Sequence, residues 1–382
     1  MSFMLEYINK NLSLEQMENE LVKLIDEYSE LSEKHLLIYS VDFNKTDLPI
    51  SICMDDLYTI RDVLRNNKSQ KLSFFIETPG GSGEAAEEIA TFLRNKYEYV
   101  DFLIAGECKS AGTILSMCGD EIYLSETGSL GPIDAQIQIG RSYGSAHDYM
   151  KWVEDKMEEA EKNGFLNNFD ALMVAQISPN ELKGVENSLK YGRELVTTFL
   201  KKYKFKTWKF TETNHKKVTE EMKNQRAEEI ARKLSDHSLW KSHGRSLNID
   251  TLNNELQLKI NKIDDDEKIS EIIERIHVLI RLIFSSSSAY KIIADNETKL
   301  VKSAIEVSSV QDQDFSNIIG CNVICNICNK KHKLFLNLSN DKSVEKELEK
   351  EGLKPFPKNN ILICDCGNEL NLEDIKNQIL NN

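Results

Sequence analysis

The spacing of hydrophobic positions changes several times along the chain, and each change predicts an element. From Leu14 to His35 apolar residues recur every three or four positions, which predicts an amphipathic helix. Similar helical patterns return at 55–66, 84–95 and 110–118. Short, almost continuously apolar runs at 36–43, 72–78, 100–106 and 121–124 predict buried strands. Because these strands alternate with helices, we expect repeated βαβ units and a mainly parallel sheet covered on both faces.

The second half of the chain is more polar and more helical. Residues 148–239 and the stretch from Asp250 to Ile283 carry charged helical patterns, and the serines at 285–288 predict a helix interruption or a loop. A shift in composition at 303–315 predicts a linker. We therefore expect three parts, namely an N-terminal helical segment at 1–35, an α/β domain at 36–303 and a small cysteine-rich domain at 304–382.

Composition and charge narrow the function classes. The chain has 382 residues and a formal net charge of −14, which argues against a nucleic-acid-binding protein, because phosphate recognition needs clustered Lys and Arg. The short basic stretch 201–209 is expected to be a solvated helix face. The N-terminus has no secretory pattern, and no apolar run approaches the ~20 residues of a membrane span. We therefore expect a cytoplasmic protein without a membrane segment and without a disulfide framework.

Two turns at the ends of predicted strands could carry acyl-transfer chemistry, which needs a nucleophile, a base and donors for the developing oxyanion. In the first turn, Gly80 and Gly81 can expose backbone N–H groups in conformations that other residues avoid. In the second turn, Ser110 begins a predicted helix, where unpaired N–H groups, including that of Ala111, favour negative charge. Each turn alone also fits a purely structural role, because Ser is a common helix cap and Pro-Gly-Gly a common turn. At successive ends of parallel strands, however, both turns should lie on the same edge of the sheet.

The sequence around these turns, at 72–94 and 104–137, resembles the serine dehydrogenase proteinases of the Clp-protease/signal-peptide-peptidase clan. The shared features are a Pro-Gly-Gly loop, a Ser-Ala-Gly turn and the run Gly-Ser-Leu-Gly-Pro-Ile-Asp that follows it. The stretches 236–249 and 289–303 are also similar to that family. The resemblance implies a crotonase-like ββα superhelix that usually oligomerises, with Ser110 as nucleophile and Gly80, Gly81 and Ala111 around the oxyanion.

The resemblance leaves the general base open. Clp proteases carry the His of their triad in the segment that matches 132–138, which has no His here. His243 lies in the region where Clp proteases carry their third triad member, so we take it as the candidate base. Signal peptide peptidases use a Lys instead, and the matching interval contains Lys151, Lys156 and Lys162. The other histidines considered are expected to be surface or packing residues, namely His147, His215 and His237.

The cysteine-rich tail predicts a metal site. Zn²⁺ prefers four thiolate or imidazole ligands in a tetrahedron, and close cysteine pairs can wrap the ion from two sides. Two such pairs occur here, Cys325 with Cys328 and Cys364 with Cys366, separated by a predicted helix at 342–352 between strands at 333–338 and 361–364. With all four positions filled by protein, the Zn²⁺ of this zinc ribbon should be structural. The alternatives are four reduced cysteines without metal, or Cys321 and more weakly His332 as a ligand. Three cysteines outside the tail are expected to be buried thiols, namely Cys53, Cys108 and Cys118.

These patterns favour a serine peptidase that hydrolyses peptide bonds through a Ser110 acyl-enzyme, within a homo-oligomer and with a protein or peptide as substrate. The analogy with Clp proteases also allows for an activating protein partner. One alternative is an inactive Clp-like protein that binds a peptide or a partner protein and uses the zinc ribbon as an adaptor. A crotonase-type enzyme acting on an acyl-thioester is disfavoured, because those enzymes generally place a carboxylate over the oxyanion pocket.

Overall fold

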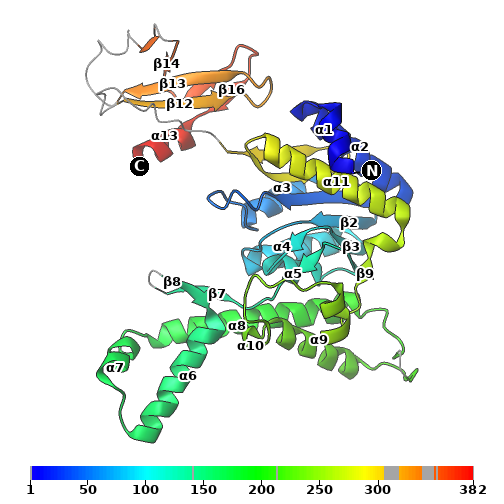
Figure 1. The fold of residues 1–382 in the computed structure, drawn as a ribbon, viewed down its shortest axis with the longest axis vertical. Coiled ribbons are helices and arrows are strands. Elements are labelled where there is room, and N and C mark those ends of the chain that lie inside the picture. Colours follow the sequence, from blue (N-terminus) through cyan, green and yellow to red (C-terminus); the bar gives the residue numbers. More distant parts are fainter. Residues whose placement is uncertain are drawn as a thin grey trace. The chain divides into compact units, whose positions relative to one another are not determined.

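The computed structural model describes residues 2–139, 142–211, 214–304, 318–337, 348–349 and 352–381 (Figure 1). The chain divides into two compact units, Met1–Lys302 and Ser303–Asn382, each of which is described by itself. Within the described part, no helix is both long and apolar enough to span a bilayer.

The first unit is built on a seven-stranded sheet in the order β11-β10-β1-β2-β3-β5-β9. Its parallel strands are β1 (His35–Val41), β2 (Lys71–Ile76), β3 (Tyr99–Ile104), β5 (Glu121–Leu124) and β9 (Asn261–Lys262). On the other side of β1, β10 (Ala289–Ala294) pairs antiparallel, followed by β11 (Lys299–Ser303). Strand β1 is buried along its whole length, as expected for a strand with both faces covered. The predicted α/β class with a mainly parallel sheet is therefore confirmed.

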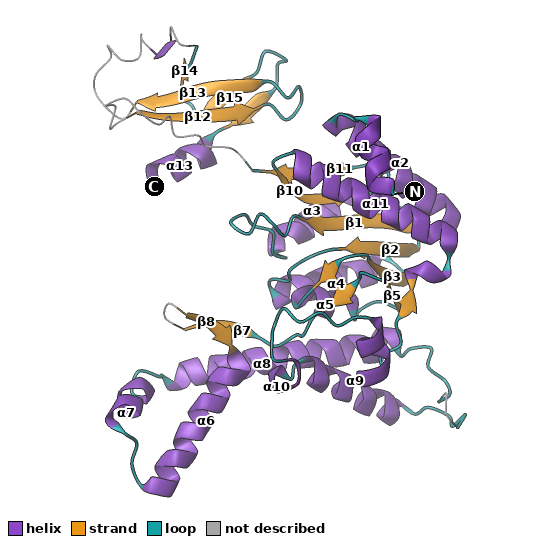
Figure 2. Cartoon of the chain, viewed as in Figure 1, coloured by secondary structure: helices purple, strands orange, loops and turns teal. Residues whose placement is uncertain are grey.

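Helices cover both faces of this sheet (Figure 2). One face packs against α3 (Met54–Val63), α4 (Gly83–Lys96) and α5 (Ala111–Ser116), and the other against α2 (Leu14–Ser32) and α11 (Glu267–Ser286), with α1 (Phe3–Lys10) beside α11. Helix α2 begins where Ser13 and Gln16 form a reciprocal capping box. Helix α11 ends within the serine run, where the Ser287 hydroxyl donates to the carbonyl of Ile283.

The helical pattern predicted from Asp250 to Ile283 is only partly correct in its first half, because α11 begins only at Glu267. The preceding residues form a π-helical turn, Thr251–Glu255, and then an irregular segment, in which Gln257 has a φ of 52°, before β9. In that segment Leu256, Leu258 and Ile260 are all buried. A residue in the left-handed region ends the helical geometry here, and glutamine at position 257 gives no sequence signal for such a break. A 3-10 turn, Ile263–Asp265, joins β9 to α11.

The region predicted to be helical, 148–239, is largely so, except in the described residues between Lys204 and Glu220. It comprises α6 (Ala146–Asn163), α7 (Asn168–Val174), α8 (Pro179–Phe199), α9 (Glu220–Leu234) and α10 (His237–Trp240). In Figure 1, α6 and α7 form a hairpin that extends away from the sheet of this unit. A short β-hairpin, β7 (Gln136–Ile139) and β8 (Ser142–Ser145), leads into α6.

A second, small sheet positions the candidate active site. Strand β4 (Glu107–Cys108) pairs in parallel with β6 (Ser129–Leu130). Isolated bridges extend this pairing, from Cys108 to Thr78 on one side and from Leu130 to Leu247 on the other. Four chain segments that are far apart in sequence therefore run side by side, each a few residues from a candidate site residue.

The second unit contains a three-stranded sheet, β12 (Ile318–Ile324), β13 (Lys331–Asn337) and β14 (Lys354–Pro355). A two-stranded sheet, β15 (Ile361–Ile363) and β16 (Glu369–Asn371), is followed by α13 (Glu373–Asn381). The helix predicted at 342–352 and the linker at 303–315 lie largely outside the described residues. The ββα superhelix and the assignment of this unit as a zinc ribbon stay predictions.

Candidate active site and metal centre

Ser110 occupies the turn between β4 and α5 in a conformation that few non-glycine residues adopt. Its φ is 49° and its ψ is −115°, which costs about 1–3 kcal/mol of backbone strain. Its hydroxyl is not used to cap α5, although it stands at the N-cap position. By contrast, other serines at N-cap positions in this unit each accept a hydrogen bond from their own helix, namely Ser2, Ser13, Ser82, Ser145 and Ser178. The partly exposed Ser110 hydroxyl has no hydrogen-bond partner among the described residues and is available for chemistry.

The Pro-Gly-Gly loop lies directly against this turn. Gly80 has a φ of 108°, and a Cβ added to it would lie 2.6 Å from the Cβ of Ser110 and 3.2 Å from the backbone nitrogen of Ala111. Gly81 has a φ of 146° and is exposed. In the described part of the chain, the N–H groups of Gly81 and Ala111 have no acceptor. The structure therefore brings the two turns together, and the residues that follow Gly80 and Ser110 each carry an N–H group without an acceptor among the described residues.

His243 contacts a carboxylate that the sequence analysis did not assign, that of Asp134. The Nδ1 of His243 lies 2.7 Å from Oδ1 of Asp134, which leaves Nε2 without a partner among the described residues. His237, predicted to be a surface or packing residue, binds the second oxygen of Asp134 through its own Nδ1 at 2.8 Å. Burial raises the pKa of Asp134, but hydrogen bonds and charge from His243 and His237 outweigh burial, so the pKa of Asp134 is lowered. Asp134 is the last residue of the Gly-Pro-Ile-Asp run, and that motif was the only signal that could have drawn attention to it.

The small sheet holds this pair close to α5. Leu130 and Leu247 exchange two backbone hydrogen bonds, so the segments that carry Asp134 and His243 run together. The Thr113 hydroxyl accepts from the N–H of Gly131 and donates to its carbonyl, one helical turn after Ser110. No hydrogen bond joins His243 to Ser110 in the described structure, and such contacts often tighten only when substrate binds.

The side chain of Lys109 also connects the segment around Leu130 with the segment around Ser246. Its buried Nζ donates to the hydroxyls of Ser246 at 2.8 Å and Ser129 at 3.0 Å and to the carbonyl of Leu130 at 3.3 Å. Burial lowers the pKa of this ammonium group. Gly131 leaves room for the lysine, because a Cβ at that position would lie 2.8 Å from Cδ of Lys109.

The alternative bases lie in different surroundings. Lys156 on α6 is engaged by Asp170 at 2.7 Å and Glu159 at 2.8 Å, and Lys151 and Lys162 are exposed on the same helix. His147 packs near His237, with ring centroids 6.4 Å apart, whereas His215 is exposed in a loop. His237 shares Asp134 with His243, but Nε2 of His237 lies 3.3 Å from Oδ2 of Asp148. Among the described residues, His243 combines a carboxylate at Nδ1 with an Nε2 that has no partner, which is the geometry of an oriented base.

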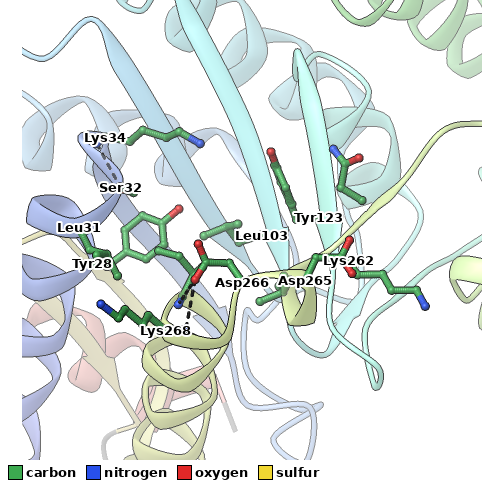
Figure 3. Close-up of a pocket in the computed structure, with 13 residues that line it drawn as sticks. Tyr28, Leu31, Ser32, Lys34, Leu103, Tyr123, Lys262, Asp265, Asp266 and Lys268 are labelled. Carbon is green, nitrogen blue, oxygen red and sulfur yellow. Dashed lines mark hydrogen bonds between the residues drawn. The ribbon is translucent and has the colours of Figure 1, made fainter.

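A separate cavity of about 520 Å³ lies between the end of α2 and the start of α11 (Figure 3). It is lined by Tyr28, Lys34, Tyr123, Asp266 and Lys268, among others. None of its lining residues belongs to the site around Ser110.

Comparison with known proteins supports a peptidase-like class for the region around this site. Residues 48–196 match the model of the ClpP-like SDH-type serine proteinase family. This match confirms, for that part of the chain, the resemblance predicted from the two turns.

Two curated relatives are uncharacterized proteins of Methanocaldococcus jannaschii. MJ1495 is 25% identical over 155 residues, which are 39% of this chain and 49% of that protein. MJ0137 is 26% identical over 141 residues, 35% of this chain and 46% of that protein. The chain thus matches about half the length of each relative. A solved structure of the 1510-N membrane-bound stomatin-specific protease, as a serine-to-alanine mutant, aligns with 14% identity over 37% of this chain and 72% of that one, with a TM-score of 0.23.

The second unit brings four cysteines into one cluster. The sulfur atoms of Cys325, Cys328, Cys364 and Cys366 all lie within 4.8 Å of one another. Across the two pairs, the sulfurs of Cys325 and Cys366 are 3.6 Å apart and those of Cys328 and Cys364 are 3.4 Å apart. Sulfurs at ~2.3 Å from a tetrahedral zinc ion would be about 3.8 Å apart, so the cluster fits such an ion closely.

The surroundings of the cluster shift its thiol pKa values in both directions. The backbone N–H of Lys330 lowers the pKa of Cys328, but the sulfurs of Cys364 and Cys366 outweigh it and raise that pKa to about 12. Backbone N–H groups of Cys328 and Ile327 lower the pKa of Cys325 to about 6. Nε2 of the buried His332 lies 3.2 Å from the sulfur of Cys364, where it can support that ligand from outside the set of four. Cys321, the other alternative ligand, packs in the hydrophobic core of this unit.

Proposed function

We propose that this chain is a serine peptidase that hydrolyses peptide bonds through an acyl-enzyme on Ser110. In this proposal His243 is the general base, Asp134 orients it, and the N–H groups of Gly81 and Ala111 bind the oxyanion, with Gly80 shaping their loop. The observation that carries the proposal is the Ser110 hydroxyl, which stands at a helix N-cap in a strained conformation and yet does not cap the helix. Strain of this kind is characteristic of functional sites.

The proposed chemistry follows from these positions. Oγ of Ser110 attacks the carbonyl carbon of the scissile bond while Nε2 of His243 takes the hydroxyl proton. The carbonyl oxygen becomes negative and is stabilised by the two backbone N–H groups. His243 then donates its proton to the leaving amine as the C–N bond breaks. In the second half, water gives a proton to His243 as its oxygen attacks the ester carbonyl, and His243 returns the proton to Oγ of Ser110 as the acid product leaves. The buried Asp134 stabilises the imidazolium that forms in each half of the reaction.

A fluorophosphonate probe that reacts with activated serines tests the proposal directly. We expect wild-type protein to be labelled on Ser110, as mapped by mass spectrometry, and Ser110→Ala to lose all labelling. Ser178→Ala is the matched control, because it removes a serine that caps α8 and should leave labelling intact. Labelling that survives in Ser110→Ala, or its absence from folded wild type, contradicts the peptidase and favours an inactive peptide-binding protein.

Three further properties belong to the same proposal. The protein is cytoplasmic, it binds one structural Zn²⁺ through Cys325, Cys328, Cys364 and Cys366, and it acts as a homo-oligomer on protein or peptide substrates. Exposed apolar side chains on and beside α7 support self-association, namely Phe165, Phe169 and Leu172. Light scattering of wild type and of a Phe169→Ser/Leu172→Ser variant tests the oligomer, because a smaller particle is expected only for the variant. Activation by a second protein remains an analogy with Clp proteases.

A further inference from the structure

The Pro-Gly-Gly loop is held in place by a neighbouring segment, residues 51–53. The N–H of Ile52 donates to the carbonyl of Gly80 at 2.7 Å, and the carbonyl of Ile52 accepts from the N–H of Ser82 at 3.0 Å. The residues on either side of Gly81 are therefore both hydrogen-bonded to Ile52. A Cβ at Gly81 would overlap the backbone of Ile52, so the approach is as close as glycine allows. The direction in which the N–H of Gly81 points is therefore set by the position of Ile52.

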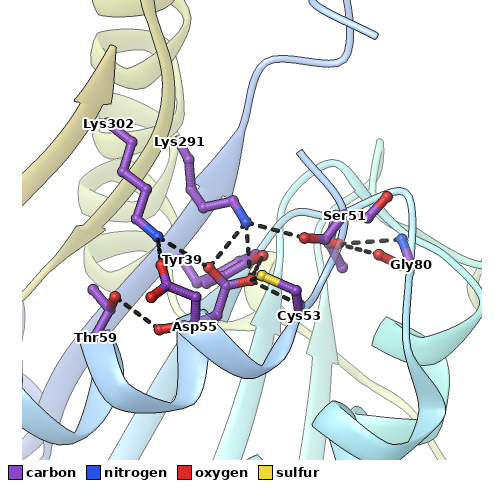
Figure 4. A network of polar contacts seen from close by, with 10 residues as sticks. Tyr39, Ser51, Cys53, Asp55, Thr59, Gly80, Lys291 and Lys302 are labelled. Carbon is purple, nitrogen blue, oxygen red and sulfur yellow. Dashed lines mark hydrogen bonds and ion pairs between the residues drawn. The ribbon is translucent and has the colours of Figure 1, made fainter. Parts of the chain in front are cut away.

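The segment 51–53 is in turn anchored on both sides of Ile52 by a buried ion pair (Figure 4). Nζ of Lys291, on β10, donates to the carbonyl of Ser51 at 3.0 Å. Oδ2 of Asp56, on α3, accepts from the N–H of Cys53 at 3.0 Å. Lys291 and Asp56 contact each other at 2.9 Å, and both side chains are almost completely buried.

Stability alone does not account for this ion pair. Burying two charges carries a large desolvation cost, and apolar side chains of similar volume often stabilise a protein as well or better. The pair nevertheless makes directed contacts to backbone groups on either side of Ile52, and Asp56 also accepts a hydrogen bond from the hydroxyl of Tyr39 at 2.9 Å. Directed contacts of this kind fix geometry, and oxyanion stabilisation depends on donor positions that are set before the reaction begins.

We propose that Lys291, paired with Asp56, is a positioning residue for the oxyanion loop, and this proposal rests on the proposed peptidase function. The chain of contacts runs from Lys291 and Asp56 to Ser51 and Cys53, through Ile52, to the loop beside Ser110. Lys291 touches neither substrate nor Ser110. Its loss should slow the chemical step by displacing the donors, without weakening the initial binding of a substrate or inhibitor.

The test is the rate of fluorophosphonate labelling of Lys291→Met, separated into the maximal inactivation rate and the inhibitor concentration that gives half of it. We expect the maximal rate to fall ten- to hundred-fold, as for a small displacement of a catalytic group, and the half-maximal concentration to change less than two-fold. Lys34→Met is the matched control. It breaks another lysine–aspartate pair, to the buried Asp101 at 2.5 Å, whose residues have no contact with the loop. Labelling of Lys34→Met should proceed at the wild-type rate.

Several outcomes overturn the proposal. If wild type is labelled and folded Lys291→Met is labelled within two-fold of it, Lys291 does not position the loop. An equal loss of rate in Lys34→Met attributes the effect to general destabilisation. If Lys291→Met does not fold, Asp56→Asn keeps the size of that side chain but removes the charge that pairs with Lys291, and an unchanged maximal rate in folded Asp56→Asn also rejects the proposal. Failure of the peptidase itself is recognised separately, because wild type is then not labelled at all.

Discussion

At the scale of single residues, Asp134 is hydrogen-bonded to two histidines, His243 and His237. In Asp134→Asn, the amide can no longer stabilise a protonated His243 or hold it in the required tautomer. We expect Ser110 labelling at neutral pH to fall by about 10²–10⁴-fold, as when the acid of a triad is replaced by its amide. Circular dichroism should report an unchanged fold. His237→Asn, which leaves the contact between His243 and Asp134 in place, should cost far less, and equal losses in the two variants would argue against His243 as the base.

Glu77 makes the stability of the first unit sensitive to acid. Its carboxylate is completely buried and accepts from Arg281 at 2.6 Å and Ser40 at 2.7 Å, with His277 at 3.0 Å. Burial raises the pKa of Glu77, but His277 and Arg281 outweigh burial, and the folded-state pKa is lowered. A carboxyl group with a lowered folded pKa stabilises the protein above its unfolded pKa of about 4.3, and this contribution is lost as the pH falls through the folded pKa.

We therefore expect Glu77→Gln to be less stable than wild type at pH 7, by on the order of 2 kcal/mol. Urea unfolding at pH 7 and at about pH 3.5 should show a smaller difference between the two proteins in acid. A difference that is the same at both pH values would mean that the charge of Glu77 does not contribute.

At the scale of elements, the sequence predicted those parts whose signal is local. The strands that became β1, β2, β3 and β5 are apolar runs, and the turns at Gly80 and Ser110 follow the ends of such runs. Asp134 was missed because its partner His243 lies 109 positions away and is brought near only by the pairing of Leu130 with Leu247. Lys291 was missed for the same reason. No local sequence pattern indicates that β10 contacts the segment before α3, because Lys291 and Ser51 are 240 positions apart.

The contact between the two turns can be tested at Gly80. In Gly80→Ala, the new methyl group meets the Cβ of Ser110 at 2.6 Å, and the φ of 108° is unfavourable for alanine. We expect labelling of Ser110 to fall by at least about 10²-fold, because the donors and the nucleophile are pushed apart. Gly164→Ala is the control. Gly164 also has a positive φ, of 76°, but a Cβ there meets open space, so the labelling rate should stay at the wild-type value. Equal effects in the two variants would attribute the loss to backbone strain alone.

At the scale of the whole molecule, the site extends beyond the region matched to the peptidase family. Gly80, Ser110 and Asp134 lie within residues 48–196, whereas His243 and Lys291 lie after them. A fragment that ends with the matched region would keep the turn at Ser110 but lose His243, the proposed base, and Lys291, the proposed anchor of the oxyanion loop. The proposed peptidase therefore requires residues from several parts of the first compact unit, Met1–Lys302.

The second unit should depend on its metal while the first does not. Its hydrophobic core is small and built around residues such as Val323, Leu334 and Phe356, and cores of this size commonly need a metal or a disulfide to stay folded.

We expect one zinc ion per chain by elemental analysis. After removal of zinc with a chelator, limited proteolysis should cut after residue 303, while the thermal transition of the first unit and the labelling of Ser110 persist. Cys364→Ser should reproduce the effect of the chelator, whereas Cys321→Ser, outside the cluster, should retain zinc. Two outcomes would refute a structural metal: purified protein that contains no zinc, or a second unit that resists proteolysis after the zinc is removed. The reason is that four thiolates repel one another once the cation between them is gone, so a fold organised around them cannot persist.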